Sequence, residues 1–268
     1  MNRLQKVSAD AASAGRKIFC AFTTVGYPDL VKTEKLVLGF ARDGVDIVEL
    51  GFPFSDPLAD EPTIQYSSEQ ALAGGVRLKD AFDLARKLRK KRCEVPLVFF
   101  TYFNPIFRYG TKKFLSQARS SGFDAVLVPD LPPEQEGDFR REAKAQGLAQ
   151  IFLIAPTTSP ARMRMIARES EGFIYYVSLR GVTGARQAVP SDIRRHLAEI
   201  KKTADKPVLV GFGVSKPDQA RELSRWSDGV IVGSAIIDRI RKADGRIEPA
   251  SEFIREMVLA VKGETGGR

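Results

Sequence analysis

Short runs of apolar, largely β-branched residues alternate along the chain with longer segments in which apolar residues recur at helical spacing. Each run ends at Gly, Pro, Asp or Thr, and helical segments such as residues 30–44 and 133–147 end at glycine, a common helix terminator. Strands that alternate with helices predict a parallel sheet, and near-continuous apolar strands predict burial on both faces. The eight runs are residues 17–26, 46–54, 96–103, 125–132, 149–156, 172–179, 207–214 and 229–236.

Eight strand–helix units in 268 residues predict that the sheet closes into a barrel, because such a barrel takes about 250 residues. We therefore expect an α/β fold, a (β/α)8 TIM barrel with an N-terminal capping helix formed by the residues before Lys17. An open doubly wound sheet is the alternative, but it usually carries a glycine-rich turn after its first strand, and TTVGYPD here has no GxGxxG. No shift in composition marks a second domain, so residues 1–268 are expected to form a single barrel domain.

Composition narrows the class of protein without identifying it. Hydrophobic residues make up 43% and charged residues 28% of the chain, which is typical of an ordinary soluble globule. The two cysteines, Cys20 and Cys93, lie far apart without metal-ligand spacing, and we expect a reduced, cytoplasmic protein with no metal site. Neither a signal peptide nor a membrane span is expected, since no apolar run is long enough for either.

The net charge of +9 permits a nucleic-acid partner. The densest basic run, KLRKKR at residues 87–92, follows an amphipathic stretch and suits the carboxyl end of a helix. No recognition motif or aromatic platform accompanies it. We expect a solvated helix end and no nucleic-acid partner.

Chemistry in a (β/α)8 barrel belongs at the carboxyl ends of the strands, and the second run carries a carboxylate there. If Val48 and Leu50 face the helices, strand alternation points Glu49 into the lumen. Burial raises the pKa of a carboxyl toward the range useful for proton transfer at neutral pH. Position therefore favours a functional Glu49 over a structural glutamate in a lumen network.

A long loop, GFPFSDPLADEPTIQ at residues 51–65, follows this strand, and its prolines favour an ordered path over the barrel mouth. Asp60 lies near the end of this loop. A role in chemistry and a role near the start of the next helix, with Pro62 in the first turn, are about equally supported for Asp60. Asp56 is similar, since it could simply accept bonds from local backbone amides.

Glycine-bearing turns after the last three strands predict a phosphate site. They are RGVTGA at 180–185, GFGVS at 211–215 and VGSAII at 232–237, the last of which opens a short helix. Glycine allows backbone amides to approach a ligand, helix N-termini attract anions, and barrels often bind phosphate after strands seven and eight. The segment RGVTGARQAVP also suits a mobile lid.

The only histidine, His196, lies in a helical stretch and is expected at the surface, which leaves no histidine-based catalysis.

From the residues alone, the prediction is a phosphate-binding barrel with acid–base carboxylates, which several lyases and isomerases fit. The loop VELGFPFSDPLADEPTIQ goes further, because it closely resembles the signature of tryptophan synthase alpha chains. The resemblance continues along the chain in YFNPIFRYG, VPDLPPEQ, IAPTTSPARM, GVTGAR, GFGVSKPDQ and VGSAII.

The resemblance implies a lyase of tryptophan biosynthesis that splits indole-3-glycerol phosphate into indole and glyceraldehyde 3-phosphate by retro-aldol cleavage. It places the catalytic pair on Glu49 and Asp60: Glu49 delivers a proton to ring carbon 3 and helps deprotonate the side-chain hydroxyl, while Asp60 accepts the indole N–H. Thr183 would close down on Asp60 when the lid shuts. The implied substrate-binding residues are Phe22, Ile64, Phe100, Leu127 and Tyr175 around the indole, Gly184, Gly213, Gly233 and Ser234 at the phosphate, and in addition Thr183 and Phe212.

The resemblance also implies a partner, the tryptophan synthase beta chain, in an α2β2 heterotetramer. Pyridoxal phosphate is expected only on that beta chain, and no cofactor on this one. The implied interface residues are Asp56, Pro57, Tyr102, Asn104 and Pro105.

Two departures from the family pattern stand out. The family loop usually reads ADGPTIQ, and here Glu61 replaces the glycine. After the sixth strand the order of serine and arginine is changed to SLRGVTG. Two other hypotheses remain. One is another phosphate-binding barrel lyase or isomerase, which would lack the SDPLADEPT loop. The other is a non-catalytic partner or activator of a beta chain, and the presence of Glu49 and Asp60 argues against it.

Overall fold

The computed structural model describes residues 1–135, 137–177, 191–211 and 213–263. Within them, parallel strands form one sheet in the order β5-β4-β3-β2-β1-β9-β8-β7-β6. The two ends of this sheet, β5 and β6, are separated in the chain by Phe152 alone, so the sheet curls into a nearly closed barrel. The predicted barrel is confirmed, with the fifth predicted strand divided into β5 and β6.

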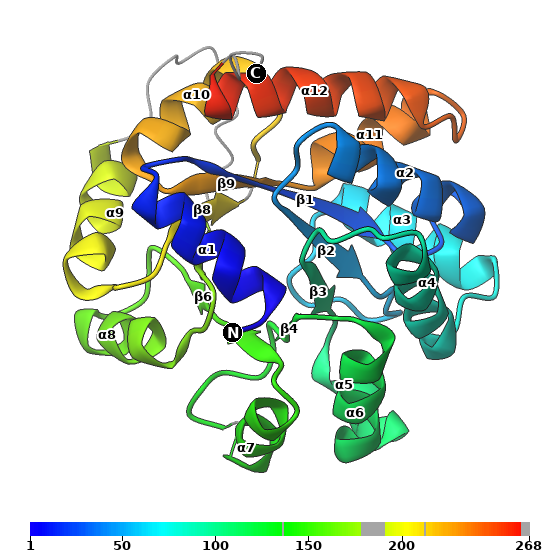
Figure 1. Ribbon diagram of the computed structural model, residues 1–268, viewed down its shortest axis with the longest axis horizontal. Coiled ribbons are helices and arrows are strands. Elements are labelled where there is room, and N and C mark those ends of the chain that lie inside the picture. Colours follow the sequence, from blue (N-terminus) through cyan, green and yellow to red (C-terminus); the bar gives the residue numbers. More distant parts are fainter. Residues whose placement is uncertain (136, 178–190, 212, 264–268) are drawn as a thin grey trace.

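Every predicted run contains a strand, and helices surround the sheet (Figure 1). The described strands are β1 Ile18–Thr24, β2 Ile47–Gly51, β3 Leu97–Phe100, β4 Ala125–Leu127, β5 Ala149–Ile151, β6 Leu153–Ile154, β7 Ile174–Val177, β8 Val208–Gly211 and β9 Gly229–Val232. The described helices are α1 Arg3–Ser13, α2 Leu30–Arg42, α3 Pro62–Ala73, α4 Leu78–Lys90, α5 Phe103–Tyr109, α6 Thr111–Ser121, α7 Gly137–Ala145, α8 Pro160–Glu169, α9 Ser191–Thr203, α10 Pro217–Trp226, α11 Ser234–Lys242 and α12 Glu248–Lys262.

Strand alternation divides the buried residues into two cores. The larger core lies between sheet and helices and includes Val48 and Leu50. The smaller one fills the lumen with residues from alternate strand positions, among them Cys20, Ile47 and Leu127. Because side chains on a strand alternate between its faces, Glu49 points into the lumen, as the sequence predicts.

Helix α1 covers one end of the lumen, as Figure 1 shows. Its Leu4 is fully buried and belongs to the lumen core. Asn2 caps the helix by accepting from the Gln5 amide, and its own amide group donates to the carbonyls of Asp124 (2.8 Å) and Gly147 (3.3 Å). The expected N-terminal capping helix is confirmed.

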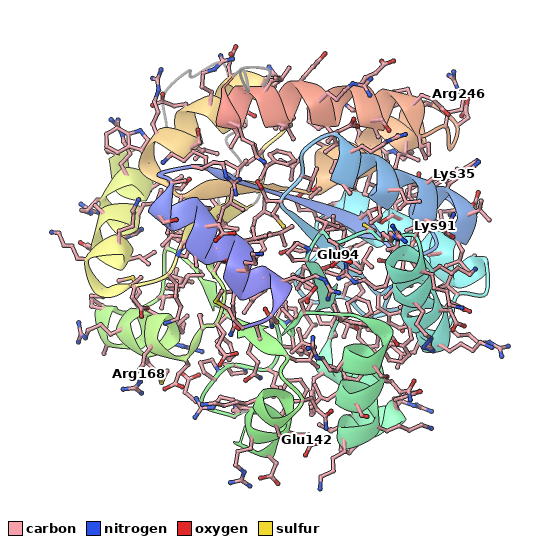
Figure 2. All side chains as sticks on the ribbon, viewed as in Figure 1. Lys35, Lys91, Glu94, Glu142, Arg168 and Arg246 are labelled. Atoms are coloured by element: carbon pink, nitrogen blue, oxygen red, sulfur yellow. The ribbon has the colours of Figure 1, made fainter. Side chains whose placement is uncertain are left out.

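Asp124 ties this capping helix to the barrel from the inside. Its side chain is fully buried, and Arg3 of α1 lies 3.3 Å from Oδ1. Oδ2 accepts from Arg89 of α4 at 2.8 Å and from the Leu97 amide of β3 at 3.1 Å. Arg3 also pairs with Glu94, which is labelled in Figure 2. One buried carboxylate thus joins α1, α4 and β3.

The basic run at residues 87–92 is the end of α4, as predicted, but its side chains are not all solvated. Arg89 turns inward and donates to the carbonyls of Val95 and Gly122 as well as to Asp124. Elsewhere charged side chains such as Lys35 and Arg168 extend outward from the helix ring (Figure 2). His196 on α9 is half-buried and its Nδ1 lies 3.3 Å from the Tyr176 hydroxyl, so it is less exposed than the expected surface residue.

We predict that Asp124→Asn lowers the free energy of unfolding by about 2–4 kcal/mol, because it leaves the mostly buried Arg89 without its counter-charge. Urea unfolding measures the change. The matched control is Asp218→Asn, which removes an exposed pair with Arg221 and is expected to change the stability by less than about 0.5 kcal/mol. Equal effects of the two substitutions would contradict the anchoring role.

Candidate active site

Glu49 occupies the middle of β2, where it lies in register with Phe22 of β1 and Val98 of β3. Its side chain is 1% exposed. Among the described residues, its Oε1 has no hydrogen-bond partner. A buried polar atom without a partner is costly, so a group of this kind in a barrel lumen points to function.

The apolar lumen changes the protonation of Glu49. Burial raises the pKa of Glu49 to about 8, and a hydrogen bond from the Cys20 thiol opposes the rise. Burial, followed by the nearby charge of Glu49, raises the pKa of Tyr175 well above its usual value. Glu49 therefore carries a proton at neutral pH and can act as a general acid. The contact with Cys20 was missed, although strand alternation places Cys20 on the same face of β1 as Phe22.

Asp60 is held by a tyrosine from the loop after the neighbouring strand β3. The Tyr102 hydroxyl donates to Asp60 Oδ1 at 2.9 Å and accepts from the Ala59 amide at 3.0 Å. Burial raises the pKa of Asp60, and the bond from Tyr102 opposes this by stabilising the carboxylate. Asp60 does not cap a helix: the N-cap of α3 is Glu61, with Pro62 in the first turn. The structure thus removes the capping alternative for Asp60.

An aromatic wall borders the lumen near Glu49. Phe22 and Phe100 meet edge to face, with ring centroids 5.6 Å apart. Phe22 packs so closely on Gly51 that a Cβ there would lie 2.3 Å from its ring. The structure brings Phe22, Phe100, Leu127 and Tyr175 together at the lumen, whereas Ile64 in the first turns of α3 packs against the outer core. The wall is aromatic and apolar, which suits packing against an aromatic ring.

The predicted phosphate residues lie at the ends of β8 and β9. Gly213 has φ +73°, a conformation that favours glycine. Gly233 lies against Phe22, since a Cβ there would approach its side chain to 3.2 Å. Ser234 opens α11, and its hydroxyl donates to the Glu61 carboxylate, a contact absent from the sequence predictions. Thr183, Gly184 and Phe212, together with the expected lid, lie outside the described residues.

The predicted interface residues follow β2 and β3. Asp56 is exposed and accepts from Ser55, Asn104 is exposed, and Pro57 and Pro105 are half-buried. Tyr102 is only 3% exposed, which places it beneath this surface and in contact with Asp60. Two apolar side chains that the sequence did not single out, Leu58 (86% exposed) and Phe107 (69% exposed), lie on the same two segments.

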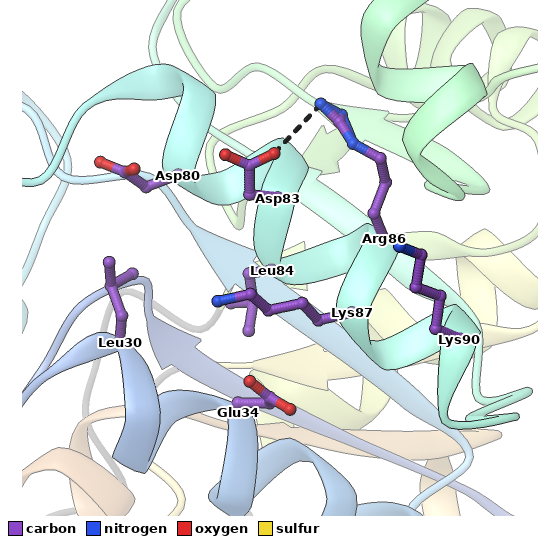
Figure 3. Close-up of a pocket in the computed structure, with 8 residues that line it drawn as sticks. All are labelled: Leu30, Glu34, Asp80, Asp83, Leu84, Arg86, Lys87 and Lys90. Carbon is purple, nitrogen blue, oxygen red and sulfur yellow. Dashed lines mark ion pairs between the residues drawn. The ribbon is translucent and has the colours of Figure 1, made fainter.

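Apart from the lumen site, a depression lies on the outside of the barrel between α2 and α4, as Figure 3 shows. Two ion pairs involve residues that line it: Asp83 lies 3.3 Å from Arg86, and Glu34 lies 2.7 Å from the neighbouring Lys91. It contains none of the predicted site residues. Across the described part of the chain, no cluster of three potential metal ligands occurs, and no helix is long and apolar enough to cross a membrane.

Comparisons with known proteins agree with this geometry. The family model described as tryptophan synthase alpha chain matches residues 8–263. The tryptophan synthase alpha chain of Geobacter sp. (strain M21) is 47% identical over 91% of both chains, and that of Thermoanaerobacter sp. (strain X514) is 42% identical over 98% of this chain and 99% of the relative.

Solved structures give the same result. The tryptophan synthase subunit alpha of Legionella pneumophila str. Paris has a TM-score of 0.89 and 33% identity, covering 97% of this chain and 98% of that one. A chain of aminoacrylate-bound tryptophan synthase from M. tuberculosis has a TM-score of 0.87 and 29% identity, covering 97% and 100%. The protein is therefore a member of the tryptophan synthase alpha chain family.

Proposed function

We propose that Glu49 and Asp60 divide the proton transfers of indole-3-glycerol phosphate cleavage, the lyase reaction of the tryptophan synthase alpha chain family. One observation carries the proposal: a buried carboxyl with a raised pKa and an unpartnered oxygen lies beside an aromatic wall in the lumen. The match to the alpha chain family over almost the whole chain disfavours another isomerase or lyase of similar fold. A direct assay of indole release from indole-3-glycerol phosphate tests the proposal.

The cleavage is a retro-aldol reaction. Glu49 donates its proton to carbon 3 of the indole ring, the neighbouring side-chain hydroxyl loses its proton, and the bond between ring and side chain breaks. The products are indole and glyceraldehyde 3-phosphate. The resulting Glu49 carboxylate takes up the hydroxyl proton, which restores the starting protonation state. A pKa of about 8 suits both steps, because general acids and bases work best near the operating pH.

Asp60 has the complementary task. Protonation of ring carbon 3 places positive charge on the indole nitrogen, whose N–H then donates to an ionised Asp60. The Tyr102 hydroxyl keeps one oxygen of Asp60 in place and favours its charged form. Two carboxyls whose surroundings differ thus take different proton roles.

The remaining residues position the substrate. The indole ring lies among Phe22, Phe100, Leu127 and Tyr175, while Ile64, which packs against the outer core, is assigned to the indole site by the family resemblance alone. The phosphate meets backbone amides at Gly213, Gly233 and the start of α11. By the family resemblance, Thr183, Gly184 and Phe212 also belong to the substrate-binding residues.

We also infer a protein partner. The M. tuberculosis structures similar to this chain are of tryptophan synthase. By the family resemblance, the partner is a beta chain that carries pyridoxal phosphate, in an α2β2 assembly, and this chain needs no cofactor. Asp56, Pro57, Asn104 and Pro105 frame the exposed apolar Leu58 and Phe107, which supports docking at this surface. The unit is proposed to be one barrel domain, residues 1–268, acting in the cytoplasm.

Glu49→Gln is expected to reduce kcat for indole release by a factor of at least about 100, since the amide fills the same space but cannot donate the proton. Binding of the substrate is expected to persist. Steady-state kinetics and isothermal titration calorimetry measure the two effects. Glu69→Gln, an exposed position on α3, is the control with the same change of charge.

The same variant tests the protonation state. Because the pKa of Glu49 is raised from 4.5 to about 8 in the folded chain, the native state binds the extra proton, and wild-type stability is lost as the pH rises through this range. The Gln variant lacks this loss, which is of the order of a few kcal/mol at about 1.4 kcal/mol per unit. Urea unfolding of both proteins, repeated at intervals of about one pH unit between about pH 5 and pH 9, measures this loss of stability. Identical pH profiles would refute a protonated Glu49.

Asp60→Asn is expected to lower kcat/KM about 100-fold, because the amide cannot balance the charge on the indole nitrogen. Tyr102→Phe is expected to lower it about 10-fold, since Asp60 keeps its charge but loses one hydrogen bond. Kinetics of the two variants and of the wild type give the ranking. Near-normal cleavage by Asp60→Asn would leave Asp60 as a loop residue only.

Leu58→Asp is expected to weaken binding of a beta chain by about tenfold or more, because it puts a charge on an exposed apolar anchor. Calorimetric titration with a purified beta chain measures the Kd, and the rate of indole release is expected to rise when the wild-type complex forms. Val31→Asp, at a 62% exposed position on α2, is the matched control. Equal affinities of both variants would show that the partner docks elsewhere.

A further inference from the structure

The Glu61 side chain reaches the proposed phosphate site from the loop between β2 and α3, on the other side of β1 from β9. Its carboxylate accepts a hydrogen bond from the Ser234 hydroxyl, although the two residues are 173 positions apart in the chain. Ser234 is the first residue of α11, a nine-residue helix preceded by Gly233. The first amides of a helix have no acceptor within the helix and attract anions. The carboxylate therefore lies where an anion is stabilised.

We propose that Glu61 is a specificity-determining residue whose carboxylate occupies part of the phosphate site in the free protein and is displaced by the phosphate of the substrate. The inference rests on the proposed function, which places the phosphate at Gly233 and Ser234. As a consequence, Glu61 weakens binding of the phosphate group. The protein then selects substrates whose remaining groups supply the binding energy.

Displacement follows from charge and from hydrogen-bond capacity. A serine hydroxyl has one proton to donate, and in the free protein Ser234 donates it to Glu61. A phosphate that accepts this hydrogen bond leaves the Glu61 carboxylate without a partner and beside a second anion. Like charges at contact distance repel strongly in a half-buried site, so the two anions do not share it.

The backbone at Glu61 limits this movement to the side chain. Glu61 has φ −66° and ψ 154°, the extended conformation that the following Pro62 imposes. Its carbonyl also accepts from the amides of Ile64 (2.9 Å) and Gln65 (3.0 Å). Rotation of the side chain alone releases Ser234, and Asp60 keeps its bond to Tyr102.

The test measures binding of inorganic phosphate to the full-length protein by isothermal titration calorimetry, without catalysis. We expect Glu61→Gln to bind phosphate about tenfold more tightly than the wild type, because the competing charge is gone. Glu69→Gln, with the same change of charge on the exposed face of α3, is expected to match the wild type. The KM for indole-3-glycerol phosphate is expected to fall in Glu61→Gln.

A second variant places the effect at Ser234. In the Glu61→Gln background, Ser234→Ala is expected to weaken phosphate binding, because it removes the released hydroxyl. Unchanged or weaker phosphate binding by Glu61→Gln overturns the proposal, as does a gain that Ser234→Ala leaves intact or that Glu69→Gln reproduces. Absence of cleavage by the wild type would instead contradict the proposed function, while the phosphate comparison still decides on Glu61.

Discussion

The site depends on burying one carboxyl group in an apolar lumen. Glu49 is 1% exposed, and the lumen residues around it, at alternate positions along the strands, are apolar or weakly polar. Removing water from a carboxyl disfavours its charged form, so burial turns an ordinary glutamate into a proton donor at neutral pH. The free-energy cost of burying this carboxyl is offset by packing in the two cores, which keep the lumen closed around Glu49.

Closure at the opposite end of the barrel matters for the same reason. Leu4 of α1 fills the lower lumen, and Asp124 holds α1 through Arg3 while also binding α4 and β3. Water that entered from this end would solvate Glu49 and lower its pKa. The capping helix is therefore part of the electrostatics of the site, although it contributes no group to the reaction.

The loop between β2 and α3 organises the other end. Two adjacent residues bond in different directions: Asp60 to Tyr102 after β3, and Glu61 to Ser234 after β9. In the sheet, β3 is one neighbour of β2, whereas β9 lies on its other side beyond β1. The loop thus connects the carboxylate held by Tyr102 with the end of the helix that begins at Ser234. In the proposed function, a change at Glu61 acts on phosphate binding, and a change at Asp60 acts on proton transfer.

The sequence by itself determined the barrel, the lumen position of Glu49 and the glycines that follow β8 and β9, because strand alternation and turn chemistry are local properties of the chain. The assignment of Asp60 needed the family resemblance, since its surroundings in sequence fit a helix start equally well. Only the tertiary structure decided the partners of these groups: Cys20 for Glu49, Tyr102 for Asp60, Ser234 for Glu61 and Asp124 for Arg89. Such contacts join residues far apart in the chain, and their geometry exists only once the sheet has closed.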